Sequence, residues 1–217
     1  MKDQDYDAYL FDWDGTLANS TEIWFQAVHE NLLLYDLELP RDVVLKSLGD
    51  WRDLIAHGLP EEHFEAYGKK AGDEAYARLH EAALYEGVRE LLYGLRKAGK
   101  KLAVVTAMPR DFIEKTLEYS GLQDFFDVVV SGSEVTHKKP HPESIFLALE
   151  QLGDVTPARA VMVGDTSRDL LAAEAAGADR VLFSPENAPF DATEIIAICK
   201  PTVVIAHWND FAPHIAR

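Results

Sequence analysis

Cysteine is almost absent from this chain. Its 217 residues include only Cys199, so no disulfide can form within the chain. Cys199 lies in the apolar run IIAICKPTVV, a setting that favours a small buried hydrophobic side chain over a reactive thiol.

Long apolar runs are also missing. No stretch reaches the length that a helix needs to span a bilayer. The N-terminal segment MKDQDYDAYLFDWDG lacks the basic region followed by an apolar region that begins a secretory signal. We therefore expect a cytoplasmic protein with no membrane partner.

Positive charge is scarce. The chain has 21 basic and 37 acidic residues, and its formal net charge is -16. Such a surface repels the phosphate backbone of nucleic acid and the anionic leaflet of a membrane, so neither is an expected partner. A small anionic substrate can bind only where a local cation makes the electrostatic potential positive. No feature of the sequence indicates an oligomer, and a monomer is the default expectation.

Six short apolar runs, rich in β-branched or aromatic residues, recur along the chain. They cover residues 7–11, 101–105, 126–130, 159–163, 180–183 and 202–206. Runs without polar alternation suit strands that are buried on both faces. Amphipathic stretches with helical spacing lie between most of them. The pattern predicts βαβ units and an α/β fold with a doubly wound, Rossmann-like parallel sheet.

The alternation fails once, between Asn19 and Tyr85. This stretch contains only helical patterns, such as TEIWFQAVHENLLLY and DEAYARLHEAALY. A helical insertion after the first strand is the simplest explanation. We expect a core formed by residues 1–18 and 86–217, and a helical domain formed by residues 19–85.

Polar residues that could act in catalysis or ligand binding follow four of the predicted strands. In chain order they are Asp12, Asp14, Thr106, Lys139, Asp165 and Asp169. In a doubly wound sheet, ligands bind at the carboxyl ends of the strands, so these side chains are expected to meet at one edge.

Acidic side chains that meet at one edge repel each other unless a cation compensates their charge. Hard oxygen ligands favour Mg²⁺. A lysine and a threonine hydroxyl nearby suit a phosphoryl group, whose oxygens they can neutralise together with the metal. The sequence therefore predicts a magnesium-dependent phosphate site.

Four motifs carry a resemblance to a known family. FDWDGTL, VVT, KKPHPESIF and VGDTSRDL occur in this order and span residues 12–169. They resemble the four motifs of the haloacid dehalogenase-like superfamily, in its phosphatase branch with a helical cap, as in phosphoglycolate phosphatase and β-phosphoglucomutase-like proteins. One such motif alone is a weak signal, but four in register with predicted strand ends are a strong one.

The resemblance implies that Asp12 is the nucleophile and forms an aspartyl-phosphate. Asp14 is then the general acid that protonates the leaving alcohol, and later the base that activates water. Asp12 and Asp165, with the backbone carbonyl of Asp14, are implied to bind Mg²⁺.

The resemblance also implies that Thr106, Ala107 and Lys139 hold the phosphoryl oxygens. Lys139 directly precedes proline, as in the third motif, which selects it over Lys138. Asp169 is implied to support the metal site through a neighbouring ligand or water. Many relatives have Asn in place of Ala107, so the chain departs from their pattern there.

The reaction implied is hydrolysis of the phosphate monoester of a small phosphorylated metabolite. Asp14 favours a phosphatase over a dehalogenase, because halide needs no proton to leave. A phosphomutase shares the same core chemistry and stays as the alternative. A phosphonoacetaldehyde hydrolase would need a lysine in the cap, but Lys46, Lys69 and Lys70 lie in no signature for it. A receiver-type phospho-acceptor domain, and an idle binding protein on the same fold, are alternatives outside this family.

Each assignment has a structural alternative. Asp12 and Asp14 could cap a turn before glycine, and Thr106 could be a plain hydroxyl at a strand end. Asp169 could serve only as an acid in the first turn of a helix.

The inserted helical stretch offers weaker candidates. Trp51 and Arg52 occupy a position where relatives often carry a substrate-specificity loop, and we expect them to contact the leaving group or a second anionic group. The alternative is that Trp51 packs within the cap and Arg52 is solvated. His137 and His141 flank the lysine loop and are candidates for a supporting role.

Overall fold

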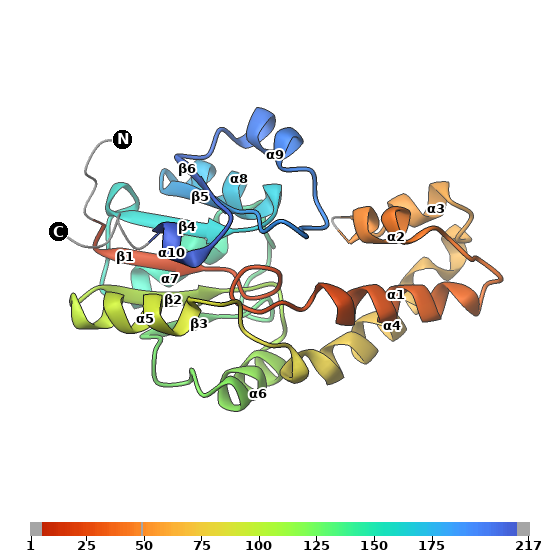
Figure 1. Ribbon diagram of the computed structural model, residues 1–217, viewed down its shortest axis with the longest axis horizontal. Helices are drawn as coiled ribbons and strands as arrows, with labels where there is room; N and C mark the ends of the chain where they lie inside the picture. The colour runs from red at the N-terminus through yellow and green to blue at the C-terminus, as the bar shows by residue number, and fades with distance from the viewer. Residues whose placement is uncertain (1–5, 49, 212–217) are drawn as a thin grey trace.

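The computed structural model describes residues 6–48 and 50–211 (Figure 1). Residues 1–5 and 212–217 of the expected core, and Gly49 of the expected helical domain, lie outside the described residues. Among the described helices, none combines the length and the apolar character needed to cross a lipid bilayer. Cys199 is fully buried, as predicted.

In the described part of the chain, six parallel strands form the sheet that the sequence predicts. They are β1 (Ala8–Phe11), β2 (Lys101–Val105), β3 (Val128–Val130), β4 (Ala160–Gly164), β5 (Asp179–Phe183) and β6 (Val203–Ile205). Their order is β3-β2-β1-β4-β5-β6, and each neighbouring pair is parallel. The doubly wound α/β fold is therefore confirmed. This order is the Rossmann one and differs from the 2-1-3-4-5 order of receiver domains, which removes that alternative.

The third predicted strand is shorter than expected. Residues 126–130 were predicted, but β3 begins at Val128. The Asp127 carboxylate accepts the backbone N–H of Leu102 at 2.8 Å. A side chain thus takes the place of a backbone carbonyl at this point, and the regular ladder begins after it.

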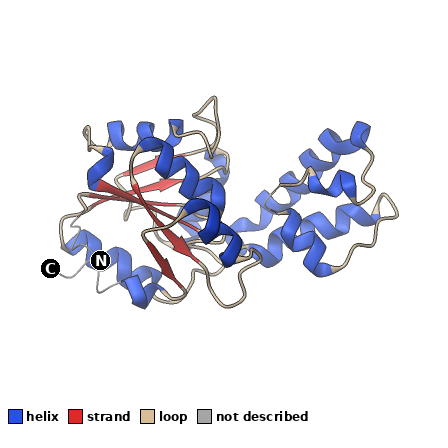
Figure 2. Cartoon of the chain, turned by 90° about the horizontal axis from the view of Figure 1, so that it is seen from above, coloured by secondary structure: helices blue, strands red, loops and turns tan. Residues whose placement is uncertain are grey.

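Successive residues of each strand point to opposite faces of the sheet, as the two-residue period requires. Tyr9 and Phe11 face a core that includes apolar residues of α5 (Val88–Lys97), α6 (Arg110–Ser120) and α10 (Trp208–Phe211). Ala8 and Leu10 face a second core with α7 (Glu143–Gln151) and α8 (Ser167–Ala176). Helices therefore cover both faces, as Figure 2 shows. A short 3₁₀ turn, η3 (Pro157–Arg159), leads into β4, and α9 (Ala192–Cys199) packs beside α8.

Among the described residues between β1 and α5, the named elements are all helices or 3₁₀ turns. They are α1 (Thr21–Leu33), α2 (Arg41–Ser47), α3 (Asp53–Ala56), α4 (Phe64–Arg78) and the 3₁₀ turns η1 (Glu61–His63) and η2 (Leu79–Glu81). Most of this segment lies to one side of the sheet (Figures 1 and 2). It has its own apolar core, which includes Val28, Leu54 and Tyr67.

The two ends of this helical segment run side by side next to the sheet. Asn19 N donates to Ala83 O at 2.8 Å, and Tyr85 N donates to Leu17 O at 3.0 Å. An antiparallel bridge between Ala18 and Leu84 lies between these bonds. The segment is thus joined to the sheet through a paired connection that lies directly after the Asp12 loop.

Candidate active site

The strand order reverses between β1 and β4, and the predicted acidic residues lie there. Asp12 directly follows β1 and Asp165 directly follows β4. Asp12 N donates to Val163 O at 3.0 Å, which carries the β1–β4 pairing one residue beyond the strand. Thr106 follows β2, the other neighbour of β1, and its N–H donates to Val130 O at 3.0 Å. In doubly wound sheets such a reversal point forms the ligand crevice.

Lys139 reaches this edge from the loop after β3. Its Nζ lies 3.0 Å from Asp12 Oδ1 and 2.5 Å from Asp169 Oδ1, and it donates to Val105 O at 2.9 Å. Its side chain is only 7% exposed. Burial alone would lower the pKa of Lys139, but the charges of Asp12 and Asp169 raise it instead. Lys139 is therefore a fixed buried cation at the sequence-predicted position.

Asp169 joins this ion pair to helix α8. Its Oδ2 accepts the backbone N–H of Thr166 at 3.1 Å and the Thr166 hydroxyl at 2.6 Å, which forms a capping box at the start of α8. Burial opposes its charge, yet Lys139 and Thr166 hold the pKa of Asp169 below its ordinary value. Both carboxylate oxygens of Asp169 thus have protein partners.

Three carboxylates gather at the reversal point. Asp12, Asp165 and Asp169 each offer an oxygen, and these oxygens lie within 4.8 Å of one another. Burial raises the pKa of Asp12, with Lys139 opposing and Asp169 adding to the shift. Burial and the charges of Asp169 and Asp12 raise the pKa of Asp165 well above its ordinary value. The group is short of positive charge and can hold a metal ion.

Asp14 lies at the same cavity, but its side chain is outside this group of three. Its Oδ1 accepts a hydrogen bond from Trp24 Nε1 at 3.3 Å, which fixes the carboxyl toward α1. Burial raises the pKa of Asp14 and favours its protonated form.

Asp165 is packed tightly against the loop after β1. Its Oδ1 accepts the Thr16 hydroxyl at 3.0 Å. Gly15 has φ +73°, and a Cβ there would lie 2.3 Å from Asp165 Oδ2. Only glycine fits this position, because a side chain would displace the carboxylate.

Gly15→Ala is expected to destabilise the protein by about 1–3 kcal/mol and to displace Asp165, with a large loss of catalytic activity. Urea denaturation and a phosphate-release assay measure the two effects. Gly99→Ala is a matched control, because Gly99 has the same φ of +73° but no atom lies within 4 Å of the place that an alanine methyl group would take. Equal activity in the two variants would contradict the proposed contact between the Gly15 loop and Asp165.

The loop after β2 has a defined shape. Met108 N donates to Thr106 Oγ1 at 3.1 Å, so the hydroxyl accepts within the loop and its hydrogen can point outward. A Cβ on Gly132 would lie 2.2 Å from Ala107 O, which shows how closely the loop after β3 packs here. Thr106 and Ala107 both line the cavity described next.

A cavity of about 500 Å³ opens between the sheet edge and the helical segment. The predicted residues Asp12, Asp14 and Lys139 line its floor together with Asp165 and Asp169. The opposite side is formed by residues from the helical segment, namely Ser20, Thr21, Trp24, Leu48, Asp50, Trp51, Gly68, Gly72 and Tyr76. The structure therefore brings residues far apart in the sequence around one open cavity.

The two candidates from the helical segment differ in position. Trp51 lines the cavity and its ring contacts the ring of Trp24 at 5.8 Å between centroids. Arg52 is not among the described residues that line it. The Arg52 guanidinium lies over the Phe64 ring, 5.1 Å from its centroid.

Several described residues of this site were not predicted from the sequence, and three of them bear on its chemistry. Trp24 holds Asp14, Tyr76 packs on Trp24 with ring centroids 5.2 Å apart, and the exposed Arg168 lines the cavity. Arg168 lies within the motif VGDTSRDL, so its place in the first turn after β4 was a usable signal. The two aromatic residues carried no such signal, because their positions depend on how α1 and α4 pack.

Comparisons with known proteins agree with this geometry. Residues 9–183 match the model of the haloacid dehalogenase-like hydrolase family. A phosphoglycolate phosphatase from Salmonella typhi is 30% identical over an alignment of 232 positions that covers 94% of this chain and 90% of that protein. The pyrophosphatase PpaX from Bacillus mycoides is 34% identical over an alignment of 213 positions that covers 96% of each chain.

The fold is shared with solved structures of the same family. A haloacid dehalogenase-like family hydrolase from Streptococcus pneumoniae superposes with a TM-score of 0.84 at 19% identity, with 100% of both chains covered. The match of the family model over most of the chain, together with the two relatives of nearly full length, settles the assignment. This chain belongs to the haloacid dehalogenase-like hydrolase family.

Proposed function

We propose that this chain is a Mg²⁺-dependent phosphatase that hydrolyses a small phosphate monoester through a phosphoryl group carried on Asp12. The observation that carries the proposal is the meeting of Asp12, Lys139 and Asp165 at the floor of one cavity. The relatives named as a phosphoglycolate phosphatase and a pyrophosphatase support release of phosphate as the reaction. We place the enzyme in the cytoplasm and divide it into a core and a cap formed by residues 19–85.

The residues present fit a magnesium ion. Asp12 and Asp165, with the backbone carbonyl of Asp14, would hold it, since hard oxygen donors are the ligands that Mg²⁺ prefers. Asp169 is better suited to a supporting role, because Lys139 and Thr166 already engage its two oxygens. When bound, Mg²⁺ supplies positive charge that neutralises the phosphoryl oxygens and the crowded carboxylates.

Asp12 and Asp14 divide the chemistry between them. Lys139 holds the Asp12 carboxylate through Oδ1, and an Asp12 oxygen attacks phosphorus as the ester P–O bond breaks. Asp14 gives its proton to the leaving alcohol. Asp14 then takes a proton from water, the water oxygen bonds to phosphorus, and the bond from phosphorus to Asp12 breaks to release inorganic phosphate.

Three groups beside Asp12 would hold the phosphoryl oxygens. The buried Lys139 supplies a point charge, and the Thr106 hydroxyl and the backbone N–H of Ala107 can donate hydrogen bonds. These donors are fixed before substrate arrives, which is what electrostatic stabilisation of a transferring phosphoryl group requires.

The test is a screen of phosphorylated metabolites for release of inorganic phosphate. We expect turnover of at least one small monoester with Mg²⁺, loss of turnover after chelation, and recovery when Mg²⁺ is returned. Turnover that survives complete chelation would contradict the proposal. Conversion of a sugar phosphate to its isomer without phosphate release would favour the phosphomutase alternative.

The cavity walls indicate which substrates fit. Arg168 is exposed at the cavity, and no ion pair joins it to another described residue. Trp24 contacts both Trp51 and Tyr76, and the three rings form an aromatic wall of the same cavity. We propose that Arg168 binds a second anionic group of the substrate while the wall packs against its carbon skeleton.

Arg168→Ala is expected to raise KM for a doubly anionic substrate by about 10–100-fold and to change kcat little, since a hydrogen bond to a charged group contributes about 1.5–3 kcal/mol. Steady-state kinetics on the best substrate of the screen measures this. Arg52→Ala is the comparison: an unchanged KM assigns anion binding to Arg168. A rise in KM for Arg52→Ala alone would support the sequence-based prediction for Arg52 instead.

A further inference from the structure

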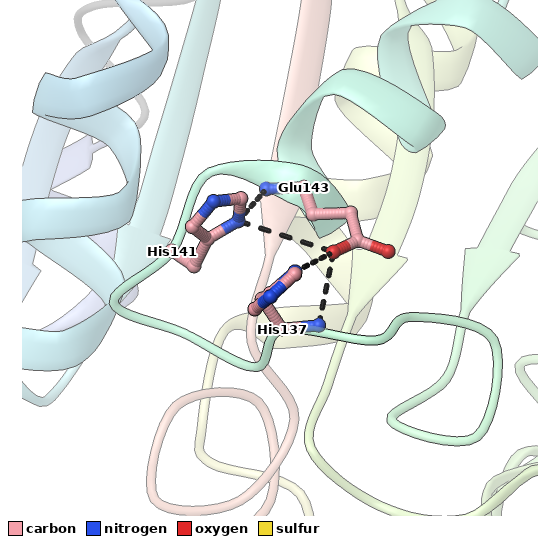
Figure 3. A group of neighbouring side chains, drawn as sticks. All are labelled: His137, His141 and Glu143. Atoms are coloured by element: carbon pink, nitrogen blue, oxygen red, sulfur yellow. Dashed lines mark hydrogen bonds and ion pairs between the residues drawn. The ribbon is translucent and has the colours of Figure 1, made fainter.

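His137, His141 and Glu143 form a cluster outside the carboxylate group, on the segment that carries Lys139 (Figure 3). His137 Nδ1 lies 2.9 Å from Glu143 Oε2, and His141 Nδ1 lies 4.0 Å from the same oxygen. One potential ligand atom from each residue lies within 4.8 Å of the other two. Figure 3 shows the carboxylate directed between the two rings. The cluster is at the surface, so an ion can reach it from solvent.

The carboxylate at the centre of the cluster is held in place by the backbone. Glu143 Oε1 accepts the N–H of Thr136 at 2.8 Å, and Oε2 accepts the N–H of His137 at 2.9 Å. These bonds lower the pKa of Glu143, so it is anionic at neutral pH. Fixed hydrogen bonds of this kind orient a carboxylate ligand before the metal binds.

The two imidazoles converge on this carboxylate. Their ring centroids lie 4.6 Å apart. Glu143 N donates to His141 Nδ1 at 3.3 Å, so the lone pair of this nitrogen points toward the Glu143 backbone, and a bound ion would replace this long hydrogen bond. Both rings are more than half exposed, at 64% and 52%, and can adjust their rotamers without disturbing a packed core.

Two histidines and a carboxylate suit a divalent transition metal ion. Two imidazole nitrogens and one carboxylate oxygen, completed by water, form a common Zn²⁺ site. With bonds of about 2.0–2.2 Å, neighbouring ligand atoms of a tetrahedral site lie about 3.4 Å apart, and the distances of 2.9 Å and 4.0 Å lie on either side of that value. Mg²⁺ prefers oxygen ligands only, so it would not compete here.

We propose that His137, His141 and Glu143 form a second metal site that binds Zn²⁺. The site is separate in chemistry from the acidic group around Asp12. Its ligands come from both sides of Lys139 in the sequence, so a bound ion would tie together the two ends of the loop that delivers this lysine.

The test is a Zn²⁺ titration of the full chain in competition with a chromophoric chelator, in the presence of excess Mg²⁺ to occupy the acidic group. We expect one Zn²⁺ bound per chain with an affinity that His141→Ala weakens by at least about 10–100-fold, the loss typical of residues that only support a metal ligand. His57→Ala, which removes another exposed histidine, should leave the affinity unchanged. Zn²⁺ should also raise the Tm of the wild type and not that of His141→Ala, because an ion that binds only the folded state stabilises it.

His141→Ala is the decisive variant, because the hydrogen bonds that Glu143 makes to Thr136 and His137 do not involve it. Glu143→Gln tests the carboxylate and should also weaken binding. Equal Zn²⁺ affinity in the wild type and in His141→Ala, or no binding by the wild type, would overturn the proposal. Since Zn²⁺ binding is measured without substrate, these outcomes do not depend on the phosphatase activity.

Discussion

Asp12→Asn is expected to lower kcat for phosphate release by roughly 10⁴-fold or more while leaving the fold intact. The amide is a poor nucleophile and cannot carry a phosphoryl group on its nitrogen under these conditions. It also removes one of the two carboxylates proposed to hold Mg²⁺. Single-turnover and steady-state assays on the best substrate measure the loss.

The same substitution is not expected to lower the Tm. Asp12 is one of three crowded carboxylates, and burial together with Asp169 and Asp14 works against its charge. Lys139 keeps its ion pair with Asp169, at 2.5 Å, when Asp12 is neutral. Asp124→Asn, at an exposed position away from the cavity, is the matched control. Wild-type turnover by Asp12→Asn would exclude Asp12 as the nucleophile.

Lys139→Met is expected to destabilise the protein by about 3–5 kcal/mol and to abolish turnover. Lys139 is the buried cation between Asp12 and Asp169, and its loss leaves two buried carboxylates without their partner. Methionine has a similar volume, so the effect reports the charge and not a cavity. Urea denaturation in the absence of metal measures the change in the free energy of unfolding.

Lys138→Met provides the control for this prediction. Lys138 is adjacent in sequence and lines the cavity, but its side chain is exposed. We expect its substitution to change stability by less than about 0.5 kcal/mol. An equal change in the free energy of unfolding in the two variants would contradict a stabilising role for the buried ion pairs of Lys139.

The strands were predictable because a strand buried on both faces has a run of apolar residues without polar alternation. Runs such as KLAVV and RAVMV have no polar residue at alternate positions, and strands β2 and β4 follow them closely. The positions of Asp12 and Asp165 followed from the same pattern, since a polar residue directly after a buried strand must lie at the sheet edge. The start of β3 was not predictable, because it depends on a hydrogen bond between Asp127 and Leu102.

The cavity wall was largely beyond prediction. The bond from Trp24 to Asp14 depends on where α1 begins relative to the β1 loop, and helical periodicity does not fix this. Arg52 stacks on Phe64, a residue of a different helix. The sequence around Arg52 contains no sign of that partner. It therefore could not show whether Arg52 lines the cavity or lies beside it.

Trapping the phosphorylated enzyme tests the role of Asp12 most directly. The protein is mixed with its best substrate and Mg²⁺, quenched during turnover, treated with hydroxylamine and mapped by mass spectrometry. Hydroxylamine converts an acyl phosphate to a hydroxamate. We expect the hydroxamate on Asp12 and its absence from Asp12→Asn. A hydroxamate on a different residue, with turnover retained in Asp12→Asn, would contradict the assignment.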